Sequence, residues 1–368
     1  MHEALEDELV DASDVSASSV DAMDDQTDGS FVVRHLSGLD SNAATGLRRL
    51  QDRLDARDQP ALVHDLRDVH LQSTHWMVTV DGWLVRETRY LIHDMHVTRN
   101  VRMIDHANAV TLDPRRIWIL GANYAPGNYW HWHAQALPAI LHSLETVSAD
   151  RRDSVSVLTG ALTAWQRDGL LAIGLKSDQV VEMERGRTLH LERLIYSDLL
   201  SSRHVFGNNS ARERTASFLK RSAERALGPE SWPPNHQRLY ISRRDSVRRP
   251  LMNEQEILKR LQRLGFTSVE NSELRLLEQV RLFGAADVVV APHGAGSTNM
   301  LFMRPGAAFV ELQQASHVNA GPLSLGKASK IVPFADVFDD DGRGQATAGW
   351  AADVERVLTL AEMAIRSR

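Results

Sequence analysis

The chain has 368 residues, enough for about two domains, because a single hydrophobic core rarely grows beyond ~250–300 residues. Its 43% hydrophobic and 24% charged residues are ordinary for a soluble globular protein. Cysteine is absent, which excludes disulfides and thiolate metal sites. No apolar run approaches the ~18 residues that span a bilayer, and the first residues do not resemble a secretory leader. We therefore expect a cytoplasmic protein, for which peripheral association with a membrane stays open.

The acidic residues are unevenly distributed along the chain. Residues 1–30 hold ten of the 48 acidic residues and none of the 42 basic ones. This segment also carries too little apolar surface to fold, so we expect a disordered acidic arm. The rest of the chain is slightly basic, which suits an anionic small ligand but is too weak a charge to indicate nucleic-acid binding.

The first predicted domain, residues 31–228, begins with a helix at 46–55 and a β-hairpin at 75–95 that turns at Asp81-Gly82. From Arg115 onward, short apolar runs alternate with helical periods. We predict strands at 116–121, 154–160, 179–183 and 188–196, and helices at 128–147, 161–175 and 210–227. Such alternation favours a parallel α/β sheet.

The breaker GPESWPPN marks the boundary to a second predicted domain, residues 229–350. We predict strands at 238–243, 266–271, 287–294 and 307–313, and helices at 253–265, 272–286 and 296–304. Asn253 and Ser272 are suitable N-caps for two of these helices. The expected fold is therefore α/β, with two Rossmann-like domains facing a central cleft and a C-terminal helix within 351–368.

The turn PHGAGSTN, residues 292–299, follows a predicted buried strand. In a parallel sheet the ligand crevice lies at the carboxyl ends of the strands. Gly294 and Gly296 let a ligand approach the backbone, and the helix opening near Ser297 offers amide donors. These features predict a diphosphate cradle, and the alternative is a tight turn whose glycines serve packing alone.

The loop SRRDSVRRPLMN carries four arginines, Arg243, Arg244, Arg248 and Arg249, after the first strand of the same domain. Guanidinium groups bind phosphate oxygens through two hydrogen bonds and stay charged, which suits a diphosphate site without a metal. The alternative is a solvated basic loop. Glu311 ends another strand, where it could bond ribose hydroxyls or pair with an arginine.

Two histidines, His131 and His133, lie in the stretch NYWHWHAQALP. The apolar positions fit one buried helical face, so the two side chains point to nearly opposite sides and cannot share a metal ion. With no cysteine and no HExxH motif, we expect no zinc site. His131 shares a helical face with Gln135, where a neutral imidazole can take a proton or bond a sugar hydroxyl. The alternative is that His131 is a buried structural histidine.

The acidic run at residues 339–341 is expected to be a solvated turn.

Together these stretches resemble glycosyltransferase family 61, which includes bacterial capsular-polysaccharide transferases, plant xylan transferases and O-linked N-acetylglucosamine transferases of the secretory pathway. The resemblance runs from about residue 117 to 312, and its most specific carrier is EQVRLFGAADVVVAPHGAGSTNMLFMRPGAAFVEL. It implies a two-domain GT-B fold, inversion, a nucleotide-sugar donor, UDP-sugar above all, and no metal or other cofactor. The positions that match the family's motifs are Asn128, Tyr129, His131, Trp132, Ser242, Arg243, Arg249 or Arg248, Asn253, Glu254, His293, Gly294 and Asn299. Many members carry an acid where this chain has Gln135, so that position cannot supply the base.

The expected function is that of an inverting, metal-independent hexosyl- or pentosyltransferase in bacterial surface polysaccharide synthesis. The acceptor would be a hydroxyl of a glycan or polysaccharide. The predicted donor-binding residues are Arg243, Arg249, His293, Gly294, Ala295, Gly296, Ser297, Asn299 and Glu311, and the predicted base is His131. Two alternatives stay open: an inactive relative that binds nucleotide-sugar or glycan without transfer, and a metal-dependent hydrolase that uses the two histidines.

Overall fold

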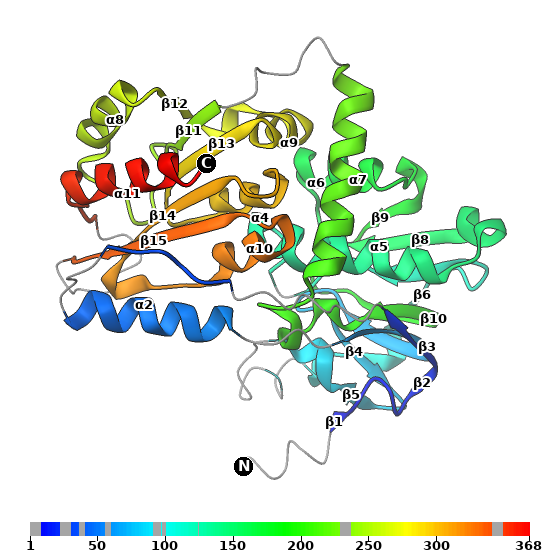
Figure 1. Ribbon diagram of the computed structural model, residues 1–368. Helices are drawn as coiled ribbons and strands as arrows, with labels where there is room; N and C mark the ends of the chain where they lie inside the picture. Colours follow the sequence, from blue (N-terminus) through cyan, green and yellow to red (C-terminus); the bar gives the residue numbers. More distant parts are fainter. Residues whose placement is uncertain are drawn as a thin grey trace. The chain divides into compact units, whose positions relative to one another are not determined.

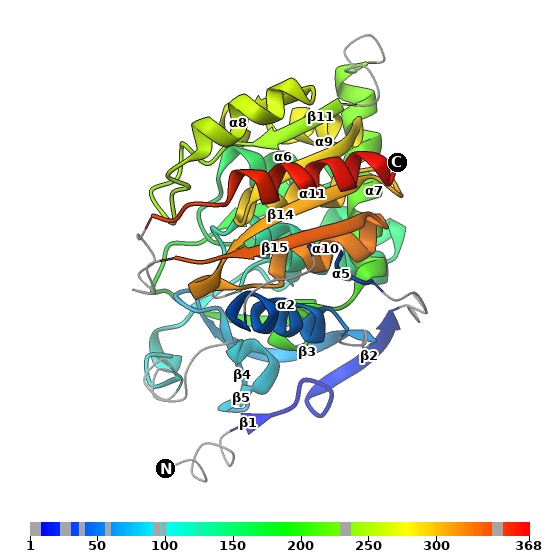
Figure 2. The same ribbon diagram turned by 60° about the vertical axis from the view of Figure 1, so that its left-hand side comes forward.

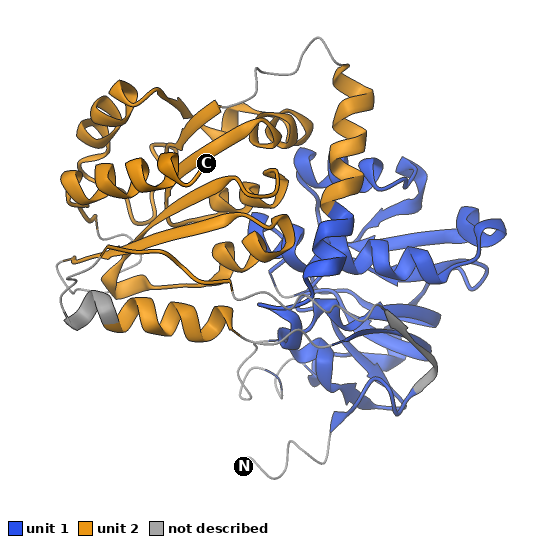
Figure 3. Cartoon of the chain, viewed as in Figure 1, with its two compact units in different colours: residues 1–26, 58–215 blue, residues 27–57, 216–368 orange. Residues whose placement is uncertain are grey.

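The structure is a computed structural model with two compact units. It describes residues 9–22, 31–36, 41–55, 60–90, 97, 101–123, 125–228, 237–340 and 349–368 (Figure 1; a second view in Figure 2). Unit 1 holds residues 1–26 and 58–215, and unit 2 holds residues 27–57 and 216–368 (Figure 3). The sequence instead predicts two domains that meet between residues 228 and 229, and these bounds stay a prediction.

Unit 1 is built around a mixed sheet with the strand order β1-β5-β4-β3-β10-β7-β8-β9, to which β2 adds beside β3 and β6 beside β10. The strands are β1 (Leu9–Val10), β2 (Ser16–Ala22), β3 (Ala61–Gln72), β4 (Met77–Val80), β5 (Trp83–Val85), β6 (Val110–Thr111), β7 (Ile117–Leu120), β8 (Val155–Thr159), β9 (Val180–Glu182) and β10 (Thr188–Ser197). The predicted parallel pairing is confirmed for β10, β7, β8 and β9. The predicted hairpin is β4–β5, and positive φ angles at Asp81 (51°) and Gly82 (83°) match a type I′ turn.

Two parts of this sheet differ from the predictions. Strand β3 was not predicted, because buried polar residues such as His64 and Gln72 interrupt its apolar pattern. The prediction of a disordered arm is wrong for residues 9–22, where β1 pairs with β5 and β2 pairs with β3. The segment has too little apolar surface to fold by itself, but its backbone forms hydrogen bonds with strands of the sheet, and these bonds order it.

The helices of unit 1 are α4 (Tyr129–His131), α5 (Leu137–Thr146), α6 (Ala164–Ala172) and the first part of α7 (Asn209–Leu227). Short 3₁₀ turns are η1 (Arg86–Arg89), η2 (His106–Asn108), η4 (Ala149–Ser154), η5 (Ser177–Gln179), η6 (Asp198–Leu200) and η7 (Ser202–His204). The predicted helix at 128–147 is helical from Tyr129 to Thr146, but its middle, η3 (Trp132–Ala136), is a π-helical turn. There the Leu137 N–H donates to the Trp132 carbonyl. Such turns are rare and occur frequently at functional sites.

Unit 2 contains a parallel sheet with the order β12-β11-β13-β14-β15. Its strands are β11 (Gln237–Ile241), β12 (Phe266–Val269), β13 (Ala286–Pro292), β14 (Ala308–Gln314) and β15 (Val332–Phe338). Its helices are α2 (Ser41–Leu54), α8 (Glu254–Arg263), α9 (Leu276–Gly284), α10 (Gly321–Ser329) and α11 (Val354–Arg366), with 3₁₀ segments η9 (Asn271–Glu273), η10 (Ala295–Phe302) and η11 (Ala315–His317). The predicted alternation is confirmed, although β15 and α10 were not predicted. The chain runs from β11 outward to β12 and then to β13 on the other side of β11, so the ligand position of a doubly wound sheet lies between β11 and β13.

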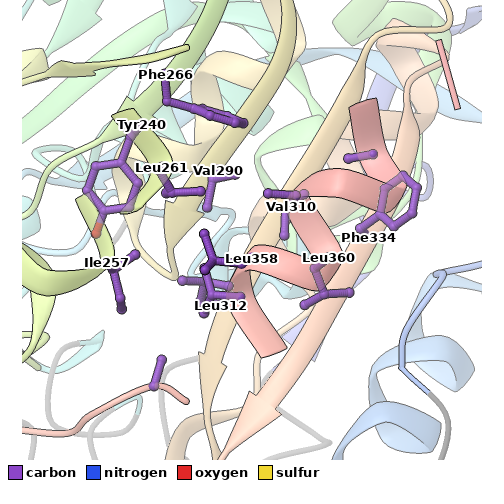
Figure 4. Close-up of a cluster of buried hydrophobic side chains, with 14 of the residues drawn as sticks. Tyr240, Ile257, Leu261, Phe266, Val290, Val310, Leu312, Phe334, Leu358 and Leu360 are labelled. Atoms are coloured by element: carbon purple, nitrogen blue, oxygen red, sulfur yellow. The ribbon is translucent and has the colours of Figure 1, made fainter. Parts of the chain in front are cut away.

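A hydrophobic cluster fixes the strands of unit 2 against two helices (Figure 4). Ile257 of α8 and Leu360 of α11 belong to the same buried cluster as Val290 and Val310 of the sheet. Burying a side chain of this size contributes ~1.5–3 kcal/mol. The strands are therefore held firmly, and the residues that follow their carboxyl ends start from fixed positions.

Neither predicted N-cap of unit 2 caps a helix with its side chain, although Asn253 occupies the N-cap position of α8. Asn253 precedes α8, but its Nδ2 donates to the Ala352 carbonyl at 2.7 Å and its Oδ1 accepts from the Ala352 N–H at 3.2 Å. Ser272 lies in η9, and α9 begins only after Arg275, whose N–H donates to Glu278 Oε2 at 2.9 Å. The Asn253 side chain bonds the backbone of the distant Ala352 instead of the first amides of α8. The chain is extended between η9 and α9, so α9 begins too late for Ser272 to cap it.

Two buried histidines of unit 1 should make the fold sensitive to acid. Burial lowers the pKa of His133 to about 3 and, as the largest effect, that of His142 to about 4. Both values lie below the ordinary 6.5, so the unfolded chain binds protons more readily than the folded one. The contribution of these two histidines to the free energy of unfolding is therefore fully present above pH ~6.5, and it is lost as the pH falls below this value. Between pH 7 and 5, each histidine should lower the free energy of unfolding by about 2 kcal/mol.

Urea denaturation at several pH values between 7 and 5 measures this loss. His133→Phe removes one titrating group but keeps a ring whose surroundings include Tyr129 and Trp165, at centroid distances of 4.5 and 6.0 Å from the histidine. We expect the variant to lose about 2 kcal/mol less than the wild-type protein over this range. An identical pH dependence of the two proteins would contradict the prediction.

Candidate functional site

The arginine loop and the glycine turn of unit 2 lie side by side at the switch point of its sheet. Strands β11 and β13 are neighbours, with Tyr240 opposite Val290, so their carboxyl ends reach the same edge. Arg243 follows β11 and His293 follows β13, and Arg243 Nη1 donates to the His293 carbonyl at 2.9 Å. The two stretches thus form one site at the edge where a doubly wound sheet binds ligands.

The Arg243 side chain is fixed by several hydrogen bonds. Its Nη2 donates to Ser246 Oγ at 2.9 Å and to the Arg248 carbonyl at 2.8 Å, and its backbone N–H donates to Glu254 Oε1 at 3.1 Å. Burial lowers the pKa of the guanidinium, and the nearby Arg249 lowers it further. In the part of the chain that the structure describes, its buried Nε has no acceptor. A fixed guanidinium with an unused donor beside a second cation suits an anionic ligand.

Arg249 adds positive charge to the same loop. Its backbone has a φ of 50°, which is uncommon for a residue other than glycine, and its carbonyl accepts from Trp350 Nε1 at 3.2 Å. Burial lowers the pKa of its guanidinium, and Arg248 contributes to the shift. Its buried Nε also lacks an acceptor among the described residues. Two partly buried guanidinium groups therefore place positive charge at this edge of the sheet.

The close approach of Arg243 requires glycine at position 294. The φ of Gly294 is 171°, which any residue can adopt, so backbone freedom is not the reason. A Cβ at this position would instead lie 1.5 Å from Arg243 Nη1. The turn therefore needs glycine so that the guanidinium can lie directly against the backbone.

Gly294→Ala should displace the Arg243 guanidinium, because its Cβ would occupy the place of Nη1. We expect the Kd for a nucleoside diphosphate, measured by isothermal titration calorimetry, to rise by about 10-fold or more. Gly160→Ala is the control, since its Cβ would make an ordinary 3.5 Å contact with Trp76. Wild-type affinity in Gly294→Ala would show that the ligand does not depend on this guanidinium.

The amides that open η10 differ in their availability. The Ser297 N–H donates to the Gly294 carbonyl at 3.0 Å, so this amide is already bonded. Among the hydrogen bonds of the described residues, the amides of Ala295 and Gly296 have no acceptor. These two N–H groups, at the start of a helical segment beside Arg243, can donate to an anion.

His293 is held by a buried carboxylate. Its Nδ1 lies 3.0 Å from Glu311 Oε1, and the two side chains are 8% and 0% exposed. Gln313 Nε2 donates to the other oxygen, Glu311 Oε2, at 2.8 Å. A carboxylate accepts, so Nδ1 of His293 carries the hydrogen and Nε2 is left for a further partner. Glu311 thus bonds His293 rather than an arginine, and its contact with ribose stays a prediction.

His317 is a member of this cluster that the sequence analysis missed. It lies in η11, and its ring centroid is 5.5 Å from that of His293. Burial, together with the nearby Arg249, His293 and Arg243, lowers its pKa to about 4. The rule that ligands meet the residues after each strand could have found it, because η11 directly follows β14.

Other predicted residues support the loops around the site. Ser242 is buried, and its Oγ accepts from the Arg244 N–H at 3.3 Å. Asn299 Nδ2 donates to Gln279 Oε1 at 2.8 Å, which joins η10 to α9. In the acidic run 339–341, Asp340 accepts a hydrogen bond from Ser316, while residue 341 lies outside the described residues.

The motif around His131 lies in unit 1. Asn128 caps α4, since its Oδ1 accepts from the His131 N–H at 3.2 Å. The Tyr129 ring centroid is 5.0 Å from that of Trp165, and Trp132 is 1% exposed, so Tyr129 packs against another aromatic ring and Trp132 belongs to the interior of the unit. Of the four motif positions, His131 has the side chain suited to proton transfer.

His131 and His133 have different surroundings. His131 Nδ1 lies 2.8 Å from Gln135 Oε1 and 3.0 Å from the Tyr90 hydroxyl. Burial lowers its pKa, and the hydrogen bond with Gln135 opposes part of that shift. His133 is 0% exposed, with its ring centroid 4.5 Å from that of Tyr129. Within the described ranges, no group of three or more histidine or acidic side chains could hold a metal ion.

Comparison with known proteins gives one family match. A family model described as Glycosyltransferase 61 matches residues 129–310. The matched stretch contains His131, Arg243 and His293 and ends just before Glu311. No curated protein matches the chain. Among the helices described, none is both long enough and apolar enough to cross a membrane.

Proposed function

We propose, from the premise that the chain belongs to glycosyltransferase family 61, that this glycosyltransferase moves a sugar from a nucleotide-sugar to a glycan hydroxyl with inversion at the anomeric carbon. In this proposal, unit 2 binds the donor and His131 of unit 1 is the base. The family match supports the transfer of a sugar, and the geometry of unit 2 supports a diphosphate ligand.

The observation that carries the donor-site proposal is the Arg243 guanidinium, held 2.9 Å from the His293 carbonyl at the switch point. The diphosphate gains negative charge as its bond to the sugar breaks, and fixed donors stabilise that charge. Removal of one such donor typically costs ~2.7–4 kcal/mol of transition-state stabilisation. Arg243, Arg249 and the amides of Ala295 and Gly296 supply both charge and donors, so the proposal needs no metal ion.

The proposed reaction is a single displacement. The acceptor oxygen forms a bond to the anomeric carbon while its proton passes to Nε2 of His131. The bond between that carbon and the β-phosphate oxygen breaks on the opposite face, and the nucleoside diphosphate leaves with the electron pair. In its imidazolium form, His293 would donate from Nε2 to this leaving group, while its Nδ1–H is engaged by Glu311.

Several finer parts of the proposal rest on the family resemblance. These are a UDP-sugar as the donor, the GT-B type of fold, a bacterial surface polysaccharide as the acceptor and a role for Asn299 in donor binding. The domain bounds 31–228 and 229–350, a cytoplasmic location and a role for Glu311 in donor binding come from the sequence pattern and belong to the proposal as well. In the proposal, Gln135 acts through the proposed base, to which it is hydrogen-bonded at 2.8 Å.

A panel of UDP-, GDP-, CDP- and dTDP-sugars, incubated with oligosaccharide acceptors with and without EDTA, tests this proposal. We expect transfer from one donor class, unaffected by EDTA, with the product of opposite anomeric configuration by NMR. Retained configuration would overturn the single displacement, and loss of transfer with EDTA would overturn the metal-free site. Nucleotide binding with no turnover of any donor would favour the inactive relative.

A further inference from the structure

Tyr90, His131 and Gln135 form a compact group of hydrogen-bonding side chains in unit 1. His131 Nδ1 is 2.8 Å from Gln135 Oε1 and 3.0 Å from the Tyr90 hydroxyl, and that hydroxyl is 2.9 Å from the same Gln135 oxygen. Gln135 is 0% exposed and Tyr90 is 7% exposed. Their polar atoms therefore depend on each other and on the nearby backbone for hydrogen bonds.

The orientation of the Gln135 amide is determined by backbone carbonyls. Its Nε2 donates to the Ser201 carbonyl at 2.9 Å and approaches the Leu199 carbonyl at 3.4 Å. Carbonyl oxygens accept only, so the NH₂ end of the amide must face them. The opposite end, Oε1, then faces His131 and Tyr90 and can only accept.

This orientation decides which nitrogen of His131 carries the hydrogen. Because Oε1 of Gln135 is an acceptor, the imidazole nitrogen 2.8 Å away must be a donor. The Tyr90 hydroxyl stays protonated, since burial raises its pKa, and it donates to the same oxygen. Its own oxygen can then accept from His131 Nδ1, so all three groups are satisfied with the hydrogen on Nδ1.

We infer that Gln135 is a positioning residue that holds neutral His131 in the Nδ1–H tautomer, with the lone pair on Nε2 ready to take the acceptor's proton. The role of His131 as the base rests on the proposed function, whereas the tautomer rests on the hydrogen bonds alone. An amide orients the imidazole as a carboxylate would, but it brings no negative charge. The base therefore keeps its geometry, while burial lowers its pKa.

Nitrogen-15 NMR of the histidine-labelled protein at neutral pH tests the tautomer without any assay of transfer. His131→Gln identifies the signals of His131 among the 16 histidines. We expect the shift of a bare nitrogen at Nε2 and of a protonated nitrogen at Nδ1. The reverse pattern, or an equal mixture of the two tautomers, would overturn the inference whatever the activity of the protein.

Two variants separate positioning from a merely structural role. Gln135→Met keeps the volume but removes the acceptor, so we expect a mixed His131 tautomer and kcat about 10- to 100-fold lower with the donor KM unchanged. Tyr90→Phe removes the second acceptor near Nδ1 but leaves the bond between His131 and Gln135, so we expect the tautomer to stay and kcat to fall by less than in Gln135→Met. An unchanged tautomer in Gln135→Met would contradict the role of Gln135. If that variant does not fold, the tautomer seen in the wild-type and Tyr90→Phe spectra decides.

The test of the proposed base is separate. Full kcat in His131→Gln would refute His131 as the base and leave the assignment of the tautomer unaffected.

Discussion

Arg243→Ala is expected to raise the Kd for the nucleoside diphosphate by about 100-fold or more. The guanidinium would supply charge-assisted hydrogen bonds to the diphosphate, each worth ~1.5–3 kcal/mol. It also holds the loop in place through the Ser246 hydroxyl and the Arg248 carbonyl, at 2.9 and 2.8 Å. Arg243→Lys keeps the charge but loses the planar fork, so its Kd should lie between those of wild type and Arg243→Ala.

Arg244→Ala is the matched control for this prediction. Arg244 is the next residue along the chain and is exposed, whereas Arg243 is half-buried against the glycine turn. Titration calorimetry should give Arg244→Ala a Kd within about 3-fold of wild type. Equal losses in the two variants would mean that the loop attracts the ligand by its net charge, and the account of a fixed guanidinium would then fail.

His131→Ala is expected to lower kcat by about 10²- to 10⁴-fold, which is the usual contribution of a general base. The Kd for the nucleoside diphosphate should stay within about 3-fold of wild type, because the diphosphate contacts proposed for the donor lie in unit 2. Steady-state kinetics with the donor and acceptor found by the panel, together with titration calorimetry, measure the two effects separately.

His133→Phe is the control for the His131 variant. His133 lies two positions along the chain, but its side chain is 0% exposed and its ring centroid is 4.5 Å from that of Tyr129. We expect His133→Phe to retain at least about a third of the wild-type kcat. Comparable losses in both variants would indicate that the whole helical stretch supports activity, and the assignment of His131 as the base would lose its basis.

Much of unit 2 could be predicted from the sequence, because its strands are short apolar runs and its helices have a clear apolar face. Helix α8, for example, buries Ile257, Leu258 and Leu261 at the expected spacing. Strand β15 and helix α10 were missed: the strand begins at Val332-Pro333, and the helix has no side-chain N-cap and contains two glycines. Strand β3 was missed because polar residues are buried along it, and burial of that kind depends on partners far away in the chain.

The candidate site was predictable only where strand ends determine it. Arg243 and His293 follow adjacent strands, so the general rule for parallel sheets brings them together. The bond between Glu311 and His293 and the place of His317 depend on side-chain orientation, which the sequence does not specify. Tyr90 is 41 residues from His131, and no periodic pattern relates two positions so far apart.

The most direct test of the central claim is the thermal shift of the wild-type protein with UDP, GDP, CDP and dTDP, each with and without EDTA, beside His293→Ala. A ligand at 100 times its Kd adds ~2.7 kcal/mol to the stability of the folded state, which gives a measurable shift. We predict a shift with one of the four nucleotides that persists in EDTA and is lost in His293→Ala. No shift with any nucleotide, or a shift that disappears in EDTA, would contradict a metal-independent diphosphate site at the switch point of unit 2.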